Sequence, residues 1–169
     1  MILTGSAIKT AQKRGDIKLV PFDIDQINPN SYNYRLGELL KVYKGMKNGL
    51  PVFDDVVIPE KGYVLKPHTM YLGHTKEIIG SKRYAMSLIG RSSMGRLGLF
   101  LQVSANLGHT TSCHQWTLEL VAAKPIRLYP GMIIGQVTFW DNYGDIYYEH
   151  PFTYANFSRP TQQVKVEKS

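Results

Sequence analysis

The stretch Leu88-Ile-Gly-Arg-Ser-Ser-Met-Gly-Arg-Leu-Gly-Leu99 decides how the rest of this chain is interpreted. It begins as the end of an apolar strand and returns to an apolar run, and between these lie two arginines, two serines and three glycines. Ser92 or Ser93 is expected to cap a short helix, because serine favours helix starts, and Gly98 is expected to end it.

The two arginines of this stretch give it a possible ligand. A helix N-terminus offers unpaired N–H groups to an anion, and Arg91 and Arg96 add fixed positive charge and bidentate donors. The alternative is a tight strand–helix–strand turn with two surface arginines. The residues alone leave both interpretations open, a phosphate site and a plain turn.

Length and composition bound the class of protein. A chain of 169 residues fits one domain with a genuine core, and no apolar run is long enough to span a membrane. The start of the chain lacks the features of a signal peptide, and Cys113 is the single cysteine, so we expect no internal disulfide and a cytoplasmic setting. The net charge of +7 favours anionic partners. The basic residues are dispersed and form no recognition motif, so we expect a nucleotide rather than nucleic acid.

Short strands separated by turn residues follow one another along most of the chain. A helix is expected over Thr4–Gly15, and the pattern is typical of an all-β barrel or jelly roll with short helices. We expect one domain over residues 1–152 and a polar C-terminal arm over 153–169. The expected strands are Ile17–Val20, Ser31–Val42, Pro51–Ile58, Tyr63–Leu65, Met70–Gly73, Ile78–Ile89, Phe100–Ala105, Trp116–Ala122, Ile126–Leu128, Ile133–Trp140 and Ile146–Tyr148, with a polar turn at Lys44–Gly49.

The segment Gly-Arg-Ser-Ser-Met-Gly-Arg-Leu-Gly-Leu, residues 90–99, resembles the signature of the dCTP deaminases, a branch of the trimeric dUTPase superfamily. Four further blocks resemble that family and keep its order. They are Ile27–Gly37, Leu72–Glu77, Thr117–Leu120 and Pro130–Gln136.

The resemblance implies a distorted β-barrel of the dUTPase-like type that assembles as a homotrimer. In that family the active sites lie between subunits, with the central motif from one subunit and the glutamate strand from another. The activity it implies is zinc-independent deamination of a cytosine deoxynucleotide, above all dCTP to dUTP and ammonia.

Glu119 is the candidate general base. It stands among apolar neighbours in Trp-Thr-Leu-Glu-Leu-Val, where desolvation would raise the pKa of a carboxylate and suit it to act near neutral pH. The commoner case for a lone glutamate is an outward-facing position on an alternating strand. The resemblance favours the catalytic role, because Glu119 falls at the position of the family's catalytic glutamate.

The remaining site residues come from the resemblance. Ser92, Arg96 and the backbone carbonyl of Ala105 are expected to assist catalysis, the arginine by stabilising negative charge on the intermediate. Mg²⁺ is expected to arrive bound to the phosphates, with no metal site made by the protein. The residues expected to bind substrate are Arg91, Ser93, His109, Thr117, Leu118, Gln136 and Tyr154.

Two segments depart from the family pattern. The family usually reads Ile-Asp-Pro-Gly where this chain has Gly108-His-Thr-Thr111, so His109 replaces an aspartate that contacts the sugar and, in dUTPases, activates the hydrolytic water. We therefore expect release of dUTP, without further hydrolysis to dUMP and pyrophosphate. In the arm the family's Lys-Tyr-x-x-Gln-x-Gly pattern is reduced to Tyr154 and Pro160.

Several alternatives stay open at this point. A zinc deaminase needs a paired cysteine motif that one cysteine cannot supply, although His109, Cys113 and His114 leave a metal site in this loop as a minor alternative. A non-catalytic nucleotide-binding homologue would keep the fold without the chemistry. A dUTP diphosphatase, or a deaminase of dCMP or of a modified cytosine nucleotide, is a further alternative.

Overall fold

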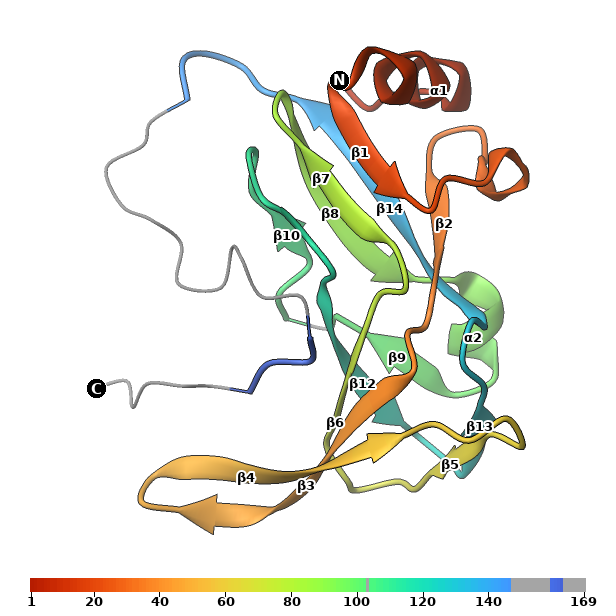
Figure 1. The fold of residues 1–169 in the computed structure, drawn as a ribbon, viewed down its shortest axis with the longest axis vertical. Coiled ribbons are helices and arrows are strands. Elements are labelled where there is room, and N and C mark those ends of the chain that lie inside the picture. Colours follow the sequence, from red (N-terminus) through yellow and green to blue (C-terminus); the bar gives the residue numbers. More distant parts are fainter. Residues whose placement is uncertain (103, 147–158, 163–169) are drawn as a thin grey trace.

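The computed structural model describes residues 1–102, 104–146 and 159–162, and this part of the chain is built mainly from short antiparallel strands (Figure 1). Its helices are α1 (Gly5–Arg14), the 3-10 turn η1 (Ile24–Gln26) and α2 (Ser92–Arg96). Its strands are β1 (Ile17–Val20), β2 (Tyr32–Arg35), β3 (Leu39–Lys47), β4 (Leu50–Val57), β5 (Tyr63–Leu65), β6 (Tyr71–His74), β7 (Ile78–Ser81), β8 (Tyr84–Gly90), β9 (Leu99–Leu101), β10 (Leu107–Gly108), β11 (Cys113–His114), β12 (Thr117–Ala122), β13 (Ile126–Leu128) and β14 (Ile133–Asp141).

Two larger sheets carry the fold. One has the strand order β10-β8-β14-β2 and the other the order β4-β3-β6-β12-β9, while β1-β7-β11 and β13-β5 form smaller sheets. The pairing of β8 with β14 runs from Gly90 opposite Gly135 to Tyr84 opposite Asp141, and Figure 1 shows these strands side by side along the molecule. The β3–β4 hairpin projects at the end of the molecule away from α1. The expected β-barrel or jelly-roll class is therefore confirmed.

Alternation along the strands builds the core. On β8 the side chains of Met86 and Leu88 are buried, and on β14 those of Val137 and Phe139 are fully buried. Burial of such a side chain stabilises a fold by about 1.5–3 kcal/mol relative to leaving it in water. The period of two in these strands therefore fixes which face of each sheet is covered.

The first helix begins and ends as its sequence predicts. The Thr4 hydroxyl accepts a hydrogen bond from the Ala7 N–H at 3.4 Å, and Gly15 ends α1 in the left-handed region at φ 82°. Ile8 and Ala11 are buried beneath the helix, as their spacing indicates.

The strand expected over Ser31–Val42 is divided into β2 and β3. The chain approaches the His74 ring at Gly37, where a Cβ would lie 2.0 Å from the ring carbon Cε1. The close approach of a ring to this backbone, which only glycine permits, interrupts the ladder. Similarly, the run Ile78–Ile89 is divided into β7 and β8 by the turn at residues 82–83.

The polar turn expected at Lys44–Gly49 is shorter in the structure. Strand β3 continues to Lys47, and Asn48 and Gly49 alone make the turn at φ 53° and 76°. Positive φ at both central residues is the geometry of a two-residue hairpin, which an Asn-Gly pair adopts readily.

Other differences lie at the ends of the sheets. The strands β10 and β11 were not expected, because two-residue strands leave no periodic pattern. Of the strand expected over Ile146–Tyr148, Ile146 is not in a strand and the other residues lie outside the described residues, as does the boundary between 152 and 153. The described part of the chain contains no helix long and apolar enough to cross a membrane.

Candidate active site

The central motif forms the short helix α2, but neither serine caps it. Arg91 is the N-cap, with extended backbone at φ −89° and ψ 148° and no side-chain capping bond, so the expectation that Ser92 or Ser93 caps the helix is wrong. The reason lies in the sheet: the Arg91 N–H donates to the Ile134 carbonyl at 3.2 Å, while its own carbonyl accepts from the first turn. Gly98, at φ 87°, follows the last helical turn as expected.

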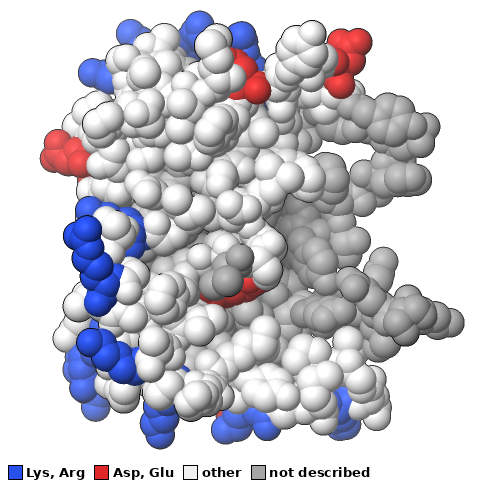
Figure 2. Space-filling model, turned by 180° about the vertical axis from the view of Figure 1, so that it is seen from behind, with Lys and Arg blue, Asp and Glu red and all other residues white. Residues whose placement is uncertain are grey.

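A cavity of about 320 Å³ opens beside this helix. Arg91 is half-buried in its wall, whereas Ser92 lines it from an exposed position, and Ser93 and Arg96 are exposed on the same helix. Figure 2 shows basic side chains along the left, top and bottom edges of one face of the molecule and an acidic surface set back in a hollow near its centre. The cavity is lined by Gly90, Arg91, Ser92, Gly95, Leu99, Phe100 and Leu101.

Glu119 lies at the middle of β12, between β6 and β9. Leu118 and Leu120 point into the core, so Glu119 and Val121 lie on the opposite face of the strand. The Glu119 side chain is half-buried, whereas Val121 and its partner Phe100 on β9 are 49% and 46% exposed. The carboxylate thus stands at the margin of an open apolar surface.

Residues just after β9 make hydrogen bonds with Glu119 and with one another. The Ser104 hydroxyl donates to Glu119 Oε2 at 3.4 Å. Gln102 accepts from the Glu119 N–H at 2.7 Å through Oε1 and donates to the Ala105 carbonyl at 3.1 Å through Nε2. The Gln102 amide thus links the backbone of Glu119 to the carbonyl of Ala105, and no motif in the sequence distinguished Gln102 or Ser104.

The neighbours of Glu119 on β12 face different surroundings. The Thr117 hydroxyl accepts from the Thr161 N–H at 3.1 Å, so the described piece of the C-terminal segment, residues 159–162, contacts this strand. Leu118 is fully buried in the core, so the structure does not place it in contact with a ligand as the sequence analysis expected.

The other expected substrate contacts are dispersed. Gln136 lies on β14 between β2 and β8, and its Oε1 accepts from the Ser31 hydroxyl at 2.9 Å. His109 is exposed between β10 and β11, and its carbonyl accepts from the Ser112 N–H at 3.2 Å. Tyr154 lies outside the described residues.

The His-and-Cys loop has ordinary protein contacts. His114 is buried against Trp116 with 4.2 Å between ring centroids, and its Nδ1 is 2.9 Å from the Gln115 carbonyl. Cys113 is exposed. Among the residues that the structure describes, no three His, Cys, Asp or Glu side chains are grouped to hold a metal ion.

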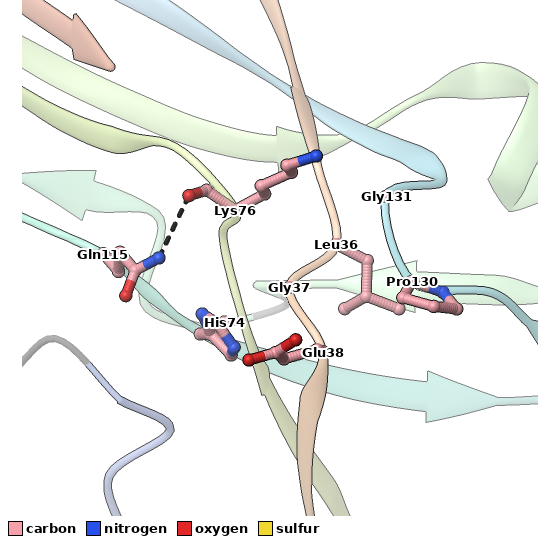
Figure 3. A pocket seen from close by; sticks show the side chains of 8 residues that line it. All are labelled: Leu36, Gly37, Glu38, His74, Lys76, Gln115, Pro130 and Gly131. Carbon is pink, nitrogen blue, oxygen red and sulfur yellow. Dashed lines mark hydrogen bonds between the residues drawn. The ribbon is translucent and has the colours of Figure 1, made fainter. Parts of the chain in front are cut away.

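A second cavity, of about 360 Å³, lies where β2 leads into β3 (Figure 3). His74 and Glu38 line it side by side, and the Gln115 amide donates to the Lys76 carbonyl across it at 3.0 Å. The buried His74 ring is 3.3 Å from the Leu39 N–H through Nε2 and 2.9 Å from the Thr75 carbonyl through Nδ1. Burial lowers the pKa of His74, although the Thr75 carbonyl and the Glu38 charge oppose this shift.

An antiparallel β fold with an arginine–serine helix and a carboxylate strand is consistent with the dUTPase-like class of nucleotide enzymes. The family model described as dCTP deaminase-like matches residues 2–142, and the chain belongs to this family.

Relatives from several bacteria resemble this chain over most of their length. A protein of Cytophaga hutchinsonii named "dCTP deaminase, dUMP-forming" is 41% identical over 160 residues, which cover 89% of this chain and 91% of that protein. One of Clostridium acetobutylicum with the same name is 43% identical, covering 86% and 85%. A Rhodopirellula baltica protein named "dCTP deaminase" is 40% identical, covering 92% and 80%.

A solved structure agrees in fold. The crystal structure of the 2'-deoxycytidine 5'-triphosphate deaminase from Agrobacterium tumefaciens matches with a TM-score of 0.67 at 22% identity. The match covers 83% of this chain and 48% of that chain, so this chain spans about half the length of that protein.

Proposed function

We propose that this chain is a zinc-independent dCTP deaminase that converts dCTP and water to dUTP and ammonia. The observation that carries the proposal is the half-buried Glu119 carboxylate, which accepts a hydrogen bond from Ser104, while the Gln102 amide joins the Glu119 backbone to the carbonyl of Ala105. Relatives named dCTP deaminase at 40–43% identity over most of both chains support the substrate.

Glu119 acts as base and then as acid. Its carboxylate takes a proton from a water molecule as the water oxygen bonds to C4 of cytosine, and delivers that proton to N3 as the C4–N3 double bond becomes single. Glu119 then takes the proton of the new C4 hydroxyl and gives it to the C4 amino group, which leaves as ammonia while the C4 carbonyl forms. One carboxylate within hydrogen-bond reach can perform both transfers.

The groups of the central motif complete the site from a second subunit in this proposal. Ser92 holds the water or the base, and Arg96 stabilises charge on the tetrahedral intermediate. Both side chains are exposed in the single chain, and so is the apolar pair Phe100 and Val121 beside Glu119. A homotrimer that covers this surface would bring the two halves of the site together.

Phosphate binding falls to the edge of the site. Arg91 and Ser93 are placed on or beside α2 to contact a triphosphate, whose oxygens are the hard ligands that Mg²⁺ prefers. Mg²⁺ then enters with the substrate. The side chains of Thr117 and Gln136, and Tyr154 from the arm, are proposed as further nucleotide contacts.

His109 bears on whether the product is dUTP or dUMP. Several relatives are named dUMP-forming, which makes dCTP to dUMP and pyrophosphate the second candidate reaction. Hydrolysis at the α-phosphorus needs a well-placed base, and an imidazole differs from a short aspartate in reach and geometry. We therefore propose dUTP as the product.

The cytoplasm is the proposed compartment, because the chain has one cysteine and needs no disulfide.

A substrate panel tests the function. The purified protein is incubated with Mg²⁺ and dCTP, dCMP, dUTP or CTP, with and without a zinc chelator, and ammonia and nucleotides are separated. We expect ammonia and dUTP from dCTP, unchanged by the chelator. Binding of dCTP without turnover of any nucleotide would identify a non-catalytic homologue, and dUMP from dUTP alone would identify a diphosphatase.

A further inference from the structure

We infer that Gln102 is a positioning residue for deamination, holding the Ala105 carbonyl in register with Glu119 through one side-chain amide. The inference rests on the proposed function, in which these two groups act on the same water. The observation behind it is that the hydrogen-bond ladder between β9 and β12 is broken at Gln102.

Strands β9 and β12 pair as Leu101 opposite Leu120, which places Gln102 opposite Glu119 at the next step. In an antiparallel ladder two such residues exchange two main-chain bonds. One of them is present, since the Gln102 N–H donates to the Glu119 carbonyl at 3.3 Å. In place of the second, the Glu119 N–H donates to the side-chain oxygen of Gln102 at 2.7 Å.

This replacement lets the chain leave the sheet. Gln102 has φ 51°, a left-handed conformation that is unfavourable for a residue with a side chain. Its amide oxygen supplies the acceptor that its main-chain carbonyl would offer in a continued strand. The Glu119 backbone therefore stays satisfied while the chain turns toward Ala105.

The other end of the same amide fixes the turn. Nε2 donates to the Ala105 carbonyl at 3.1 Å, so one planar group joins the backbone of the proposed base to the proposed carbonyl. The Glu119 N–H requires an acceptor, which settles which end of the amide is oxygen. The Ala105 carbonyl keeps a second lone pair for the water or the substrate amino group. The distance between base and carbonyl is thus set by Gln102.

The variant Gln102→Glu tests this directly. It keeps the shape and the acceptor but loses the donor, so an ionised carboxylate faces the Ala105 carbonyl beside Glu119. We expect kcat for dCTP to fall about 100-fold at pH 8, the loss that a displacement of about 1 Å can cause, with KM changed less than about threefold. Protonation restores an O–H donor, so the ratio of variant to wild-type kcat should rise as pH falls toward about 5. The other acidic side chain at this turn is Glu119, whose carboxylate accepts a hydrogen bond from Ser104.

The matched control is Gln12→Glu. Gln12 on α1 is a similar doubly bonded amide, which accepts from the Leu19 N–H at 2.9 Å and donates to the Leu19 carbonyl at 3.1 Å. It makes no contact with the β9–β12 turn in these bonds, so kcat and its pH profile should match wild type. Gln102→Met, which lacks both bonds, should lose rate without recovery at low pH, and thermal melts identify any variant that fails to fold.

The outcomes separate this inference from the proposed function. Wild-type deamination that Glu119→Gln abolishes, together with wild-type kcat in Gln102→Glu and Gln102→Met, would overturn the positioning role alone. Equal loss in Gln102→Glu at every pH would also overturn it, because the donor would then not matter. If wild-type protein releases no ammonia from dCTP, or if Glu119→Gln releases it at the wild-type rate, the proposed function itself fails. A Gln102→Glu protein that does not fold leaves the decision to Gln102→Met, whose rate must fall.

Discussion

At the scale of single residues, His109 is where the resemblance places a family aspartate. It is exposed between β10 and β11, where its carbonyl accepts from the Ser112 N–H. The family aspartate at this position contacts the sugar and, in dUTPases, orients a hydrolytic water. A neutral imidazole supplies neither the charge nor the short reach of that carboxylate.

The variant His109→Asp therefore has a defined expected product. With dCTP as substrate, we expect the wild-type chain to release ammonia with dUTP, and the variant to form dUMP and pyrophosphate as a growing fraction of product. Phosphate-resolved chromatography beside an ammonia assay measures both. If wild-type protein forms dUMP in step with ammonia, His109 does not block hydrolysis and the dUMP-forming reaction is the correct one.

At the scale of the elements, His74 joins β6 to the start of β3. Its neutral ring accepts the Leu39 N–H and donates to the Thr75 carbonyl, and burial lowers its pKa. In the unfolded chain the same ring binds a proton below about pH 6.5. The unfolded state therefore binds more protons in acid, so the contribution of His74 reduces stability as pH falls below that value.

The lowered pKa of His74 predicts how the stability of the protein changes with pH. The free energy of unfolding in urea should fall from pH 7.5 toward pH 5.5, with His74 contributing a slope of at most about 1.4 kcal/mol per pH unit. His74→Asn should reduce the slope, although it lowers stability at pH 7.5 by removing a packed ring. The control His68→Asn changes an exposed histidine at φ 59°, a conformation that asparagine tolerates, and should keep the wild-type slope. An unchanged slope in His74→Asn would contradict the role given to this ring.

Elements with a clear period could be predicted from the sequence, and those fixed by distant contacts could not. Strand β13, Ile126–Leu128, has its predicted bounds, and α1 has its predicted cap. The break at Gly37 depends on a ring that lies 37 residues further along the chain, and the start of α2 depends on the bond from Arg91 to Ile134. Neither contact leaves a local pattern.

The candidate site shows the same division. The resemblance suggested Glu119 and Ala105, whose backbones are linked in the structure by the Gln102 amide. It did not identify Gln102 and Ser104, because a polar residue at the end of a strand has no distinctive spacing. Their roles depend on the turn that follows β9, and this turn is visible in the geometry alone.

At the scale of the whole molecule, the exposed face beside Glu119 predicts assembly. Phe100 and Val121 are opposite each other on β9 and β12 and are 46% and 49% exposed, so two apolar side chains lie open on the strands that carry and flank Glu119. We expect light scattering to give about three times the 19.2 kDa mass of the chain. A homotrimer would cover this face and bring α2 of a neighbouring subunit to the carboxylate.

A charge placed on this face tests the assembly. Val121→Asp should dissociate the trimer and abolish deamination, whereas Val57→Asp on β4, where the side chain is 64% exposed, should leave both unchanged. Light scattering and the ammonia assay on the same samples measure the two effects together. A fully active monomer, in wild type or variant, would contradict a site shared between subunits.

The central claim is that the Glu119 carboxylate deaminates dCTP. The most direct test compares ammonia release from dCTP by wild type and Glu119→Gln, with dCTP binding measured by calorimetry on both. We predict that Glu119→Gln releases ammonia 10²–10⁴-fold more slowly, as expected for loss of a general base, in rough magnitude, while it still binds dCTP. Ammonia release by Glu119→Gln at a near wild-type rate would contradict the claim.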